Sequence, residues 1–458
     1  MRTIRGIIRK DFIPILIVIL LGLTIRVIVA PYSTGSDIPQ FAGFADTFLR
    51  HGVCFYLYAD GHSWEEENWP YNWPYVYGPI WIYILGVLRI IAPTPVEHYW
   101  SDGVYHVYAP MDWIVAVKAV IIFFDTIAAL LLYIIVKKIS GDNVVGVLTI
   151  ILYYLNPMAI YISGIYGMFD PIALAFMLLA ILLYKEKPLL GGLFLGLSIL
   201  AKHTMLFPSI IFVLYIVLYK KELLKKILEG ALVSIVITLA PFIIGCPQSI
   251  PVFIKVTFFS SKPGYTYPIV YSFNGLSSLA TYIHDKCGYD TLWMIKYWYI
   301  PATILLLMIV AYMMKSRELL LPLSLAYIVF TATYWRVNHQ YLVPTIAFLL
   351  LVAAKTRKLS TRITALLTIV LIGIWPIAFP TSWWFHAHIK QPNQTLWNLV
   401  DTMTLMIFCE VFYVVYSITL TELQYLTIIV ETWDKTLEKL QELIDKIKQK
   451  RIFLLYKG

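Results

Sequence analysis

The sequence predicts an all-α protein that crosses a membrane many times, and two observations carry that prediction. The 458 residues are 60% hydrophobic and only 14% charged, with a mean hydropathy of +0.74. A soluble domain has about 45–50% apolar and about 25% charged residues. Apolar stretches also recur from end to end, which indicates one membrane domain rather than several soluble ones. This composition excludes a soluble enzyme, a disordered chain and a disulfide scaffold.

About twelve stretches approach or reach the roughly 20 apolar residues that a membrane-spanning helix needs. The candidate spans are residues 12–31, 113–136, 143–162, 168–184, 188–203, 204–219, 227–245, 298–314, 319–335, 341–354, 360–378 and 397–421. The first span follows a basic N-terminus, and no cleavage site is evident after it. We therefore expect a retained first helix rather than a signal peptide.

The Lys and Arg residues decide how the short apolar segment Gly78–Ile91 is placed. Cytoplasmic loops carry an excess of these residues. If Gly78–Ile91 does not cross, most Lys and Arg residues outside the spans fall on the side of the N-terminus. If it crossed, every later loop would change sides and the excess would disappear. We therefore predict an interfacial or re-entrant helix on the outer face, with both termini in the cytoplasm.

This topology divides the chain into a transmembrane domain, residues 1–430, and a tail, residues 431–458. Residues 32–112 and 246–297 form two long outer segments of the transmembrane domain. The tail has apolar residues at helical spacing opposite Lys residues, which predicts an amphipathic helix on the anionic inner leaflet. The net charge of +9 is explained better by the excess of Lys and Arg in cytoplasmic loops than by nucleic-acid binding.

Two aspartates stand at predicted helix starts on the outer side. Asp37 begins an amphipathic segment that extends to Leu49, and Asp170 precedes Pro171 at the start of an apolar helix. Carboxylates at such positions often only cap the helix. For Asp37, the sequence leaves two roles open, a helix cap and a catalytic base. Asp170 lies at the same predicted membrane face, so the two side chains could also share one site.

Cationic residues cluster at two other turns. Lys202 and His203 interrupt two apolar segments, where a charge needs water or an anion. The lysine could snorkel, or it could bind phosphate at the headgroup level. Arg336, His339 and Gln340 lie together between two spans on the outer side, and the fork of an arginine suits phosphate. For this second cluster we favour function over a simple polar turn.

The first outer segment is rich in Trp, Tyr and Glu from residue 64 to residue 77. Such rings usually form the aromatic belt at a membrane surface, although they could also stack on sugar rings. Asp125 with Lys118 or Arg26 is expected to be a structural pair within the membrane. Cys246 and Cys287 flank one outer loop and could be bridged. No Cys/His spacing indicates zinc, and no Gly-rich nucleotide loop is present.

Four stretches of this sequence carry a family resemblance. They are the Asp37 loop followed by TFLRHG, then VYGPIWIYILG, the run from YLNPMAIYISGIYGMFDPIALAF to LAKHTMLFP, and RVNHQYLVP. In this order they resemble the GT-C superfamily of polyprenyl-phosphate-sugar-dependent glycosyltransferases. The likeness is nearest to the first mannosyltransferase of GPI-anchor synthesis and its archaeal and bacterial relatives. It implies a GT-C fold of about 12 transmembrane helices with juxtamembrane helices in the first outer loop.

The resemblance also implies an activity. A hexose, with mannose favoured, would pass with inversion from a dolichyl- or polyprenyl-phosphate donor to a lipid or glycan acceptor on the extracytosolic face. The implied site residues are Asp37 as the catalytic base, Lys202, His203, Arg336 and His339 as donor-phosphate ligands, and Asp170, Gln340 and Tyr77 as sugar or acceptor ligands. Donor, acceptor and membrane lipids are then the expected partners, without nucleic acid.

One departure from the family concerns a metal ion. The mannosyltransferase carries an Asp-x-Asp motif, whereas Pro39 stands at the second position here. We expect no required cofactor, and a divalent metal only if Asp46, Asp60 or Glu65–Glu67 supplies a second carboxylate. The alternative function is a transporter or flippase of lipid-linked sugars, which would need a polar path at the bilayer midplane. A noncatalytic subunit of a glycosylation complex is a third class.

Overall fold

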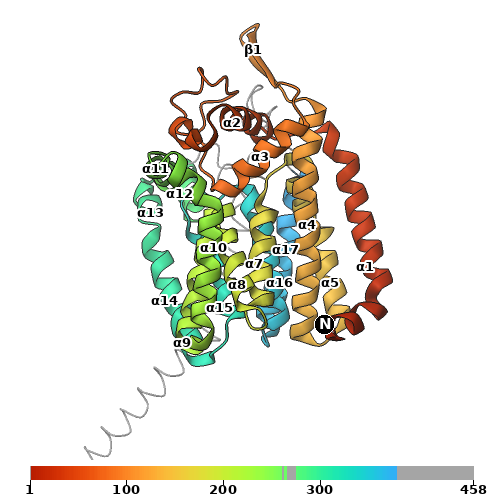
Figure 1. Cartoon of the computed structure of the whole chain (residues 1–458). Coiled ribbons are helices and arrows are strands. Elements are labelled where there is room, and N and C mark those ends of the chain that lie inside the picture. The colour runs from red at the N-terminus through yellow and green to blue at the C-terminus, as the bar shows by residue number, and fades with distance from the viewer. Residues whose placement is uncertain (1, 260–261, 266–274, 379–458) are drawn as a thin grey trace, which may run out of the picture.

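A computed structural model describes residues 2–259, 262–265 and 275–378. Within these residues the chain is a bundle of helices that run alternately in opposite directions (Figure 1). The helices of the bundle are α1 (Arg2–Val29), α4 (Met111–Ser140), α5 (Asn143–Tyr154), α7 (Asp170–Leu183), α8 (Pro188–Ala201), α9 (Leu206–Tyr219), α10 (Lys221–Gly245), α14 (Tyr299–Ser316), α15 (Leu320–Thr333), α16 (Leu342–Lys355) and α17 (Leu359–Ala378). Each lies over a predicted span. The predicted span 397–421 and the tail lie outside the described residues.

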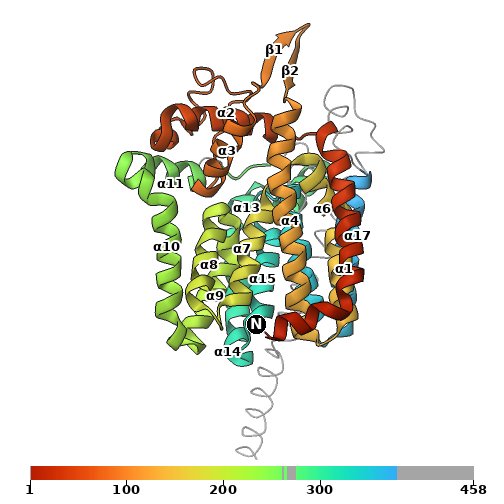
Figure 2. The same ribbon diagram turned by 45° about the vertical axis from the view of Figure 1, so that its right-hand side comes forward.

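Shorter elements gather at the end of the bundle opposite the N-terminus (Figures 1 and 2). They are α2 (Asp37–His51), η2 (Gly52–Tyr58), α3 (Pro79–Ile91), the antiparallel strands β1 (Glu97–Ser101) and β2 (Val104–Tyr108), and α11 (Ser249–Phe259). Helices α12 (Leu276–Cys287) and α13 (Leu292–Lys296) lead from there into α14. The start of α2 at Asp37 agrees with the predicted amphipathic helix.

The chain is an integral multi-pass membrane protein. Five described helices are long and apolar enough to cross a membrane, or six if the bent pair Asn143–Tyr154 and Pro157–Tyr166 counts as one span. Several other bundle helices have 14 residues. At 1.5 Å per residue they extend about 21 Å, which is less than a hydrocarbon core of about 30 Å. The total of about twelve spans therefore stays a prediction.

The outer surface of the bundle is apolar, as a lipid environment requires. Helix α1 exposes most of Ile13, Ile17 and Ile28, and α10 exposes Ile237 and Ile244. A contiguous apolar surface of this kind marks a membrane or protein contact. The charged side chains that the bundle does bury are instead paired or hydrogen-bonded in the interior, as described below.

Helix α3 does not pass through the bundle. The start of α4 contacts the segment that follows α1, because the Trp113 indole Nε1 donates to the carbonyl of Ile38 at 2.8 Å and Lys118 Nζ donates to the carbonyl of Ala30 at 2.9 Å. The chain thus leaves α1 and enters α4 at the same end. Gly78, just before α3, contacts the end of α8, where a Cβ atom would lie 1.8 Å from the carbonyl oxygen of Leu200. Only glycine allows this approach.

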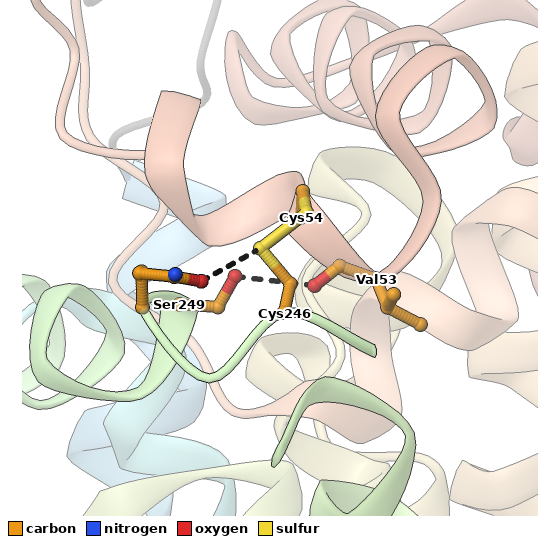
Figure 3. The surroundings of a disulfide bond; sticks show 5 residues. Val53, Cys54, Cys246 and Ser249 are labelled. Atoms are coloured by element: carbon orange, nitrogen blue, oxygen red, sulfur yellow. Dashed lines mark hydrogen bonds between the residues drawn. A yellow bond between two sulfur atoms is a disulfide. The ribbon is translucent and has the colours of Figure 1, made fainter. Parts of the chain in front are cut away.

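The disulfide differs from the one considered from sequence. Cys54 of η2 is bonded to Cys246 after α10, 192 residues away, whereas Cys287 is an exposed free thiol (Figure 3). The possible bridge between Cys246 and Cys287, considered because they flank one loop, does not form. The fold instead packs η2 against the start of α11, where the Ser249 hydroxyl donates to the carbonyl of Val53 at 3.1 Å.

Candidate functional site

Asp37 is the first residue of α2, where the partial positive charge of the helix N-terminus favours a carboxylate. The hydroxyl of Tyr166 donates to its Oδ2 at 2.8 Å. The main chain joins the same two segments, since the Gly35 N–H donates to the carbonyl of Tyr166 at 2.9 Å. A Cβ atom at Gly35 would lie 2.6 Å from the Tyr166 ring, so glycine permits the contact. Asp37 is therefore held by a tyrosine distant in sequence.

Asp170 and Lys202 form an ion pair at the same end of the bundle. Asp170 begins α7 and Lys202 follows the last residue of α8, and both side chains are inaccessible to solvent. Lys202 Nζ donates to Oδ2 of Asp170. The other oxygen, Oδ1, is buried without a hydrogen-bond partner among the described residues. A buried acceptor in this state is available to a hydroxyl group of a ligand.

Aromatic rings enclose the Lys202 ammonium. Its Nζ lies 4.8 Å from the ring centroid of Tyr341, 4.9 Å from that of Phe169 and 5.9 Å from that of Tyr77. Phe169 in turn stacks on Trp81 of α3, with 4.4 Å between ring centroids. Cation–π contacts of this kind stabilise a cation that water does not reach. The wall also excludes water from the Asp170 carboxylate.

The turn between α15 and α16 also contributes side chains to the site. The ring of His339 lies 4.3 Å from that of Tyr166, edge to face. Arg336 is exposed, and its charge lies close enough to lower the pKa of Asp37. Gln340 is buried, and its Oε1 has no hydrogen-bond partner among the described residues. This turn thus brings one exposed cation to the site, and among the described residues it also holds one buried acceptor without a partner.

Opposing effects act on the Asp37 carboxyl. Burial raises its pKa above the ordinary value, and the Tyr166 hydroxyl and the charges of Lys202 and Arg336 partly offset the rise. Burial and the charge of Asp37 raise the pKa of Tyr77 well above its usual range. Tyr77 therefore stays protonated and can donate a hydrogen bond. A carboxyl with a raised pKa is a stronger proton acceptor than an ordinary aspartate.

The structure brings most of the predicted site residues together. Those at the site are Asp37, Tyr77, Asp170, Lys202, Arg336, His339 and, in the same turn, Gln340. His203 is different: its ring lies 6.2 Å from that of Phe258 on α11. Lys202 is also not an isolated cation, because Asp170 neutralises it.

Sequence reasoning missed Tyr166, Phe169 and Tyr341, which line the site. Each stands next to or near a residue that was singled out, so the predicted residue set was incomplete. Tyr166 ends the π-helical turn η3 (Tyr161–Tyr166), and Gly167 follows with a φ of +89°. A glycine after an aromatic residue was the available signal for this sharp turn.

Two of the carboxylates considered for a metal ion, Asp46 and Glu67, are engaged in ion pairs. Asp46 accepts from Arg89 Nε at 2.6 Å, and Glu67 binds Arg50 Nη1 at 2.9 Å and the ring of His51 at 2.8 Å. Among the described residues no three His, Cys, Asp or Glu side chains cluster as metal ligands. These contacts instead tie α2 to the rest of the first outer segment.

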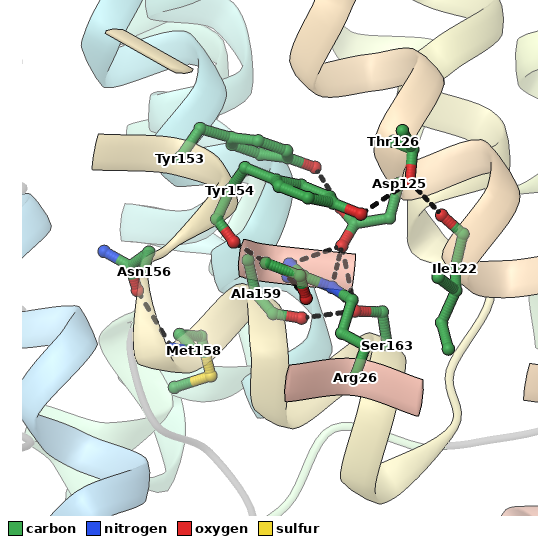
Figure 4. A network of polar contacts seen from close by, with 11 residues as sticks. Arg26, Ile122, Asp125, Thr126, Tyr153, Tyr154, Asn156, Met158, Ala159 and Ser163 are labelled. Carbon is green, nitrogen blue, oxygen red and sulfur yellow. Dashed lines mark hydrogen bonds and ion pairs between the residues drawn. The ribbon is translucent and has the colours of Figure 1, made fainter. Parts of the chain in front are cut away.

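A second polar network lies deeper in the bundle and supports the site from below (Figure 4). Arg26 of α1 pairs with Asp125 of α4 at 2.8 Å, with both side chains fully buried. Ser163 in η3 donates to the same carboxylate oxygen at 2.8 Å, and Tyr153 donates to the other at 2.8 Å. Of the two expected pairs, Asp125 thus forms the one with Arg26, while Lys118 binds carbonyl oxygens. The network fixes η3, whose last residue is Tyr166.

The model of glycosyltransferase family 87 matches residues 103–343. Among solved structures, ArnT from Cupriavidus metallidurans bound to undecaprenyl phosphate has a TM-score of 0.42 and 10% identity, over 88% of this chain and 77% of that one. The apo state of that ArnT gives 0.41 and 12%, over 88% and 76%. No curated protein matches the sequence.

Replacing Arg26 by Met should destabilise the protein strongly, because Asp125 would remain charged in an apolar interior. Removing one member of a buried pair costs about 3–5 kcal/mol. Thermal unfolding of the purified protein in detergent measures the effect. The double variant Arg26→Met/Asp125→Asn should recover much of the loss. Equal unfolding temperatures for Arg26→Met and the wild type would contradict the structural role.

Proposed function

Because the chain belongs to glycosyltransferase family 87, we propose that it transfers a hexose from a polyprenyl-phosphate donor to a lipid or glycan acceptor. Mannose as the hexose follows the resemblance to the GPI mannosyltransferase. The observation that carries the proposal is the convergence of a half-buried carboxylate, Asp37, with the cationic groups Lys202 and Arg336 at one end of an apolar bundle. A lipid tail can lie along the bundle while its phosphate reaches the exposed Arg336.

The reaction follows from these positions. Asp37 accepts the proton of an acceptor hydroxyl as the hydroxyl oxygen attacks the anomeric carbon. The bond between that carbon and the donor phosphate oxygen breaks, and the lipid phosphate leaves with its electron pair. Arg336 stabilises the charge of the leaving phosphate, assisted by Lys202 and His339. Attack from the face opposite the leaving group inverts the anomeric configuration.

The disulfide supports an extracytosolic site. Cys54 and Cys246 join two elements at the Asp37 end of the bundle, and disulfides persist in oxidising compartments. Nucleotide sugars are normally absent there, so a lipid-linked donor is the suitable substrate. Orientation of the termini toward the cytoplasm is part of the same proposal, since the N-terminus lies at the opposite end (Figure 1).

A flippase of lipid-linked sugars would use a different part of the molecule. It needs mobile polar groups near the midplane. The buried Arg26–Asp125 pair is instead held by Ser163 and Tyr153. The decisive assay incubates the purified protein with radiolabelled polyprenyl-phosphate mannose and a membrane lipid extract. A donor-dependent product supports an enzyme, whereas translocation without a new bond supports the flippase.

Asp37→Asn should lower transfer by about 10²–10⁴-fold, because the amide cannot accept the proton. Donor binding and the unfolding temperature should change little, since Asn preserves shape and can still accept from Tyr166. The radiolabel assay and thermal unfolding measure both. Full activity in this variant would reject Asp37 as the base.

The pH profile of kcat/KM should show an acid limb above pH 4, where an ordinary aspartate titrates. Asp37 must be ionised to act as a base and its pKa is raised, so activity falls as the pH drops through that higher value. Tyr166→Phe removes a hydrogen bond that favours the ionised form, so the limb should move to higher pH. Tyr32→Phe, an exposed tyrosine at the same end, is the control and should not move it. A shift to lower pH in Tyr166→Phe would contradict the assignment.

Arg336→Ala should raise the KM for the donor by roughly 10–100-fold, as expected for a lost charge-assisted hydrogen bond. Arg336→Lys should recover part of the loss. Lys255→Ala removes another exposed cation near this end, on α11, and serves as the matched control. Steady-state kinetics with varied donor measure the effect. Unchanged donor KM in Arg336→Ala would exclude the phosphate role.

A further inference from the structure

A short segment of the first outer loop is clamped beside Asp37. Gln40 follows Asp37 by three residues, so the two side chains share one face of α2. The Gln40 amide donates to the carbonyls of Tyr71 at 3.1 Å and Trp73 at 3.3 Å, and it accepts from the Tyr71 N–H at 2.9 Å. Residues 71–73 are therefore fixed next to the proposed base, although the loop has no regular structure.

The rings of this segment form an exposed surface. Tyr71 and Trp73 stack with 4.4 Å between centroids and 16° between planes, and Trp73 is 41% exposed. Tyr71 also lies 6.2 Å from Tyr105 on β2, which lies 5.1 Å from Trp100 on β1. We call these four residues the aromatic track. It leads from the Asp37 face of α2 to the hairpin that projects beyond the helices (Figure 2).

Hydrogen bonds hold Tyr105 of the track in place. The hydroxyl of Tyr105 donates to the carbonyl of Pro70 at 2.6 Å and contacts Nδ1 of His98 at 2.9 Å. Trp100 nevertheless exposes 72% of its surface. Large rings fixed in an exposed position lose little entropy on binding and mark an interaction site.

We propose that the aromatic track binds the acceptor and that the acceptor is a carbohydrate. Flat rings match the apolar C–H face of a sugar ring, and the exposed Asn72 amide between Tyr71 and Trp73 can bond sugar hydroxyls. A lipid chain is a poorer fit, because the hairpin points away from the apolar bundle. A sugar stacked on Trp73 would lie close to α2, because Gln40, three residues after Asp37, binds the Trp73 carbonyl. This inference rests on the proposed function, since it assigns the acceptor to the same site.

The Tyr71 hydroxyl adds a polar contact near the base. Burial, Tyr105 and the charge of Asp37 raise the pKa of Tyr71 to about 12, so the hydroxyl stays protonated at neutral pH. It can therefore donate to an acceptor oxygen while Asp37 accepts the proton from the reacting hydroxyl. The Tyr71 hydroxyl thus acts as a hydrogen-bond donor and the Asp37 carboxylate as a proton acceptor.

Isothermal titration calorimetry on the full chain in lipid nanodiscs tests this inference without catalysis. The probes are linear mannosides and glucosides of one to four units, with geranylgeraniol as a lipid alcohol. The wild type should bind at least one saccharide series, with affinity that rises with length. Trp73→Ala should weaken that binding by at least about tenfold, and Trp73→Phe by less than about threefold.

The matched control is Trp293→Ala, which removes another exposed tryptophan, 61% accessible on α13. It should bind saccharides as the wild type does. The inference is overturned if the wild type binds no saccharide, if Trp73→Ala and Trp293→Ala behave alike, or if only geranylgeraniol binding depends on Trp73. Saccharide binding without transfer would reject the proposed function alone. Transfer that is insensitive to Trp73→Ala would reject this inference alone.

Discussion

The place of Asp37 depends on how α4 holds the segment that follows α1. The buried Lys118 ammonium binds the carbonyl oxygens of Ala30 and Ser33, which the end of a helix leaves without partners. A cation there also meets the partial negative charge of the helix C-terminus. Together with the hydrogen bond from Trp113 to the carbonyl of Ile38, this contact places the start of α4 beside the end of α1. The long outer segment therefore starts and finishes at the same end of the bundle. The directions of the helices after α4 follow from this placement.

The buried charges of the bundle are arranged in two levels with different properties. At the deeper level, hydrogen bonds satisfy both oxygens of Asp125, including those from its partner Arg26, so this network is closed to further ligands. At the upper level, Lys202 binds one oxygen of Asp170 and the other has no hydrogen-bond partner in the described part of the chain. A closed network favours a fixed structure, whereas an open acceptor favours ligand binding. The chemistry is therefore expected at the upper level.

Local signals allowed much of this to be predicted from sequence. Asp37 and Asp170 were placed correctly at helix starts, and the described bundle helices lie over the predicted apolar stretches, because apolar length and N-terminal carboxylates are properties of short segments. The ion pair between Asp170 and Lys202 was not predicted, nor was the Cys54–Cys246 bridge. Both join segments whose proximity depends on how helices pack, and no residue pattern records that. The roles of the site residues remain proposals.

The helix ends explain why the site assembles where it does. Asp37 and Asp170 occupy the N-termini of α2 and α7, and Lys202 occupies the C-terminal end of α8. Each charge has the sign that the helix dipole favours. Because α7 and α8 are antiparallel neighbours, the N-terminus of one lies beside the C-terminus of the other (Figure 1). Opposite charges thus meet at one end of the bundle, where they are stable inside protein and a phosphate can still approach from the exposed side at Arg336.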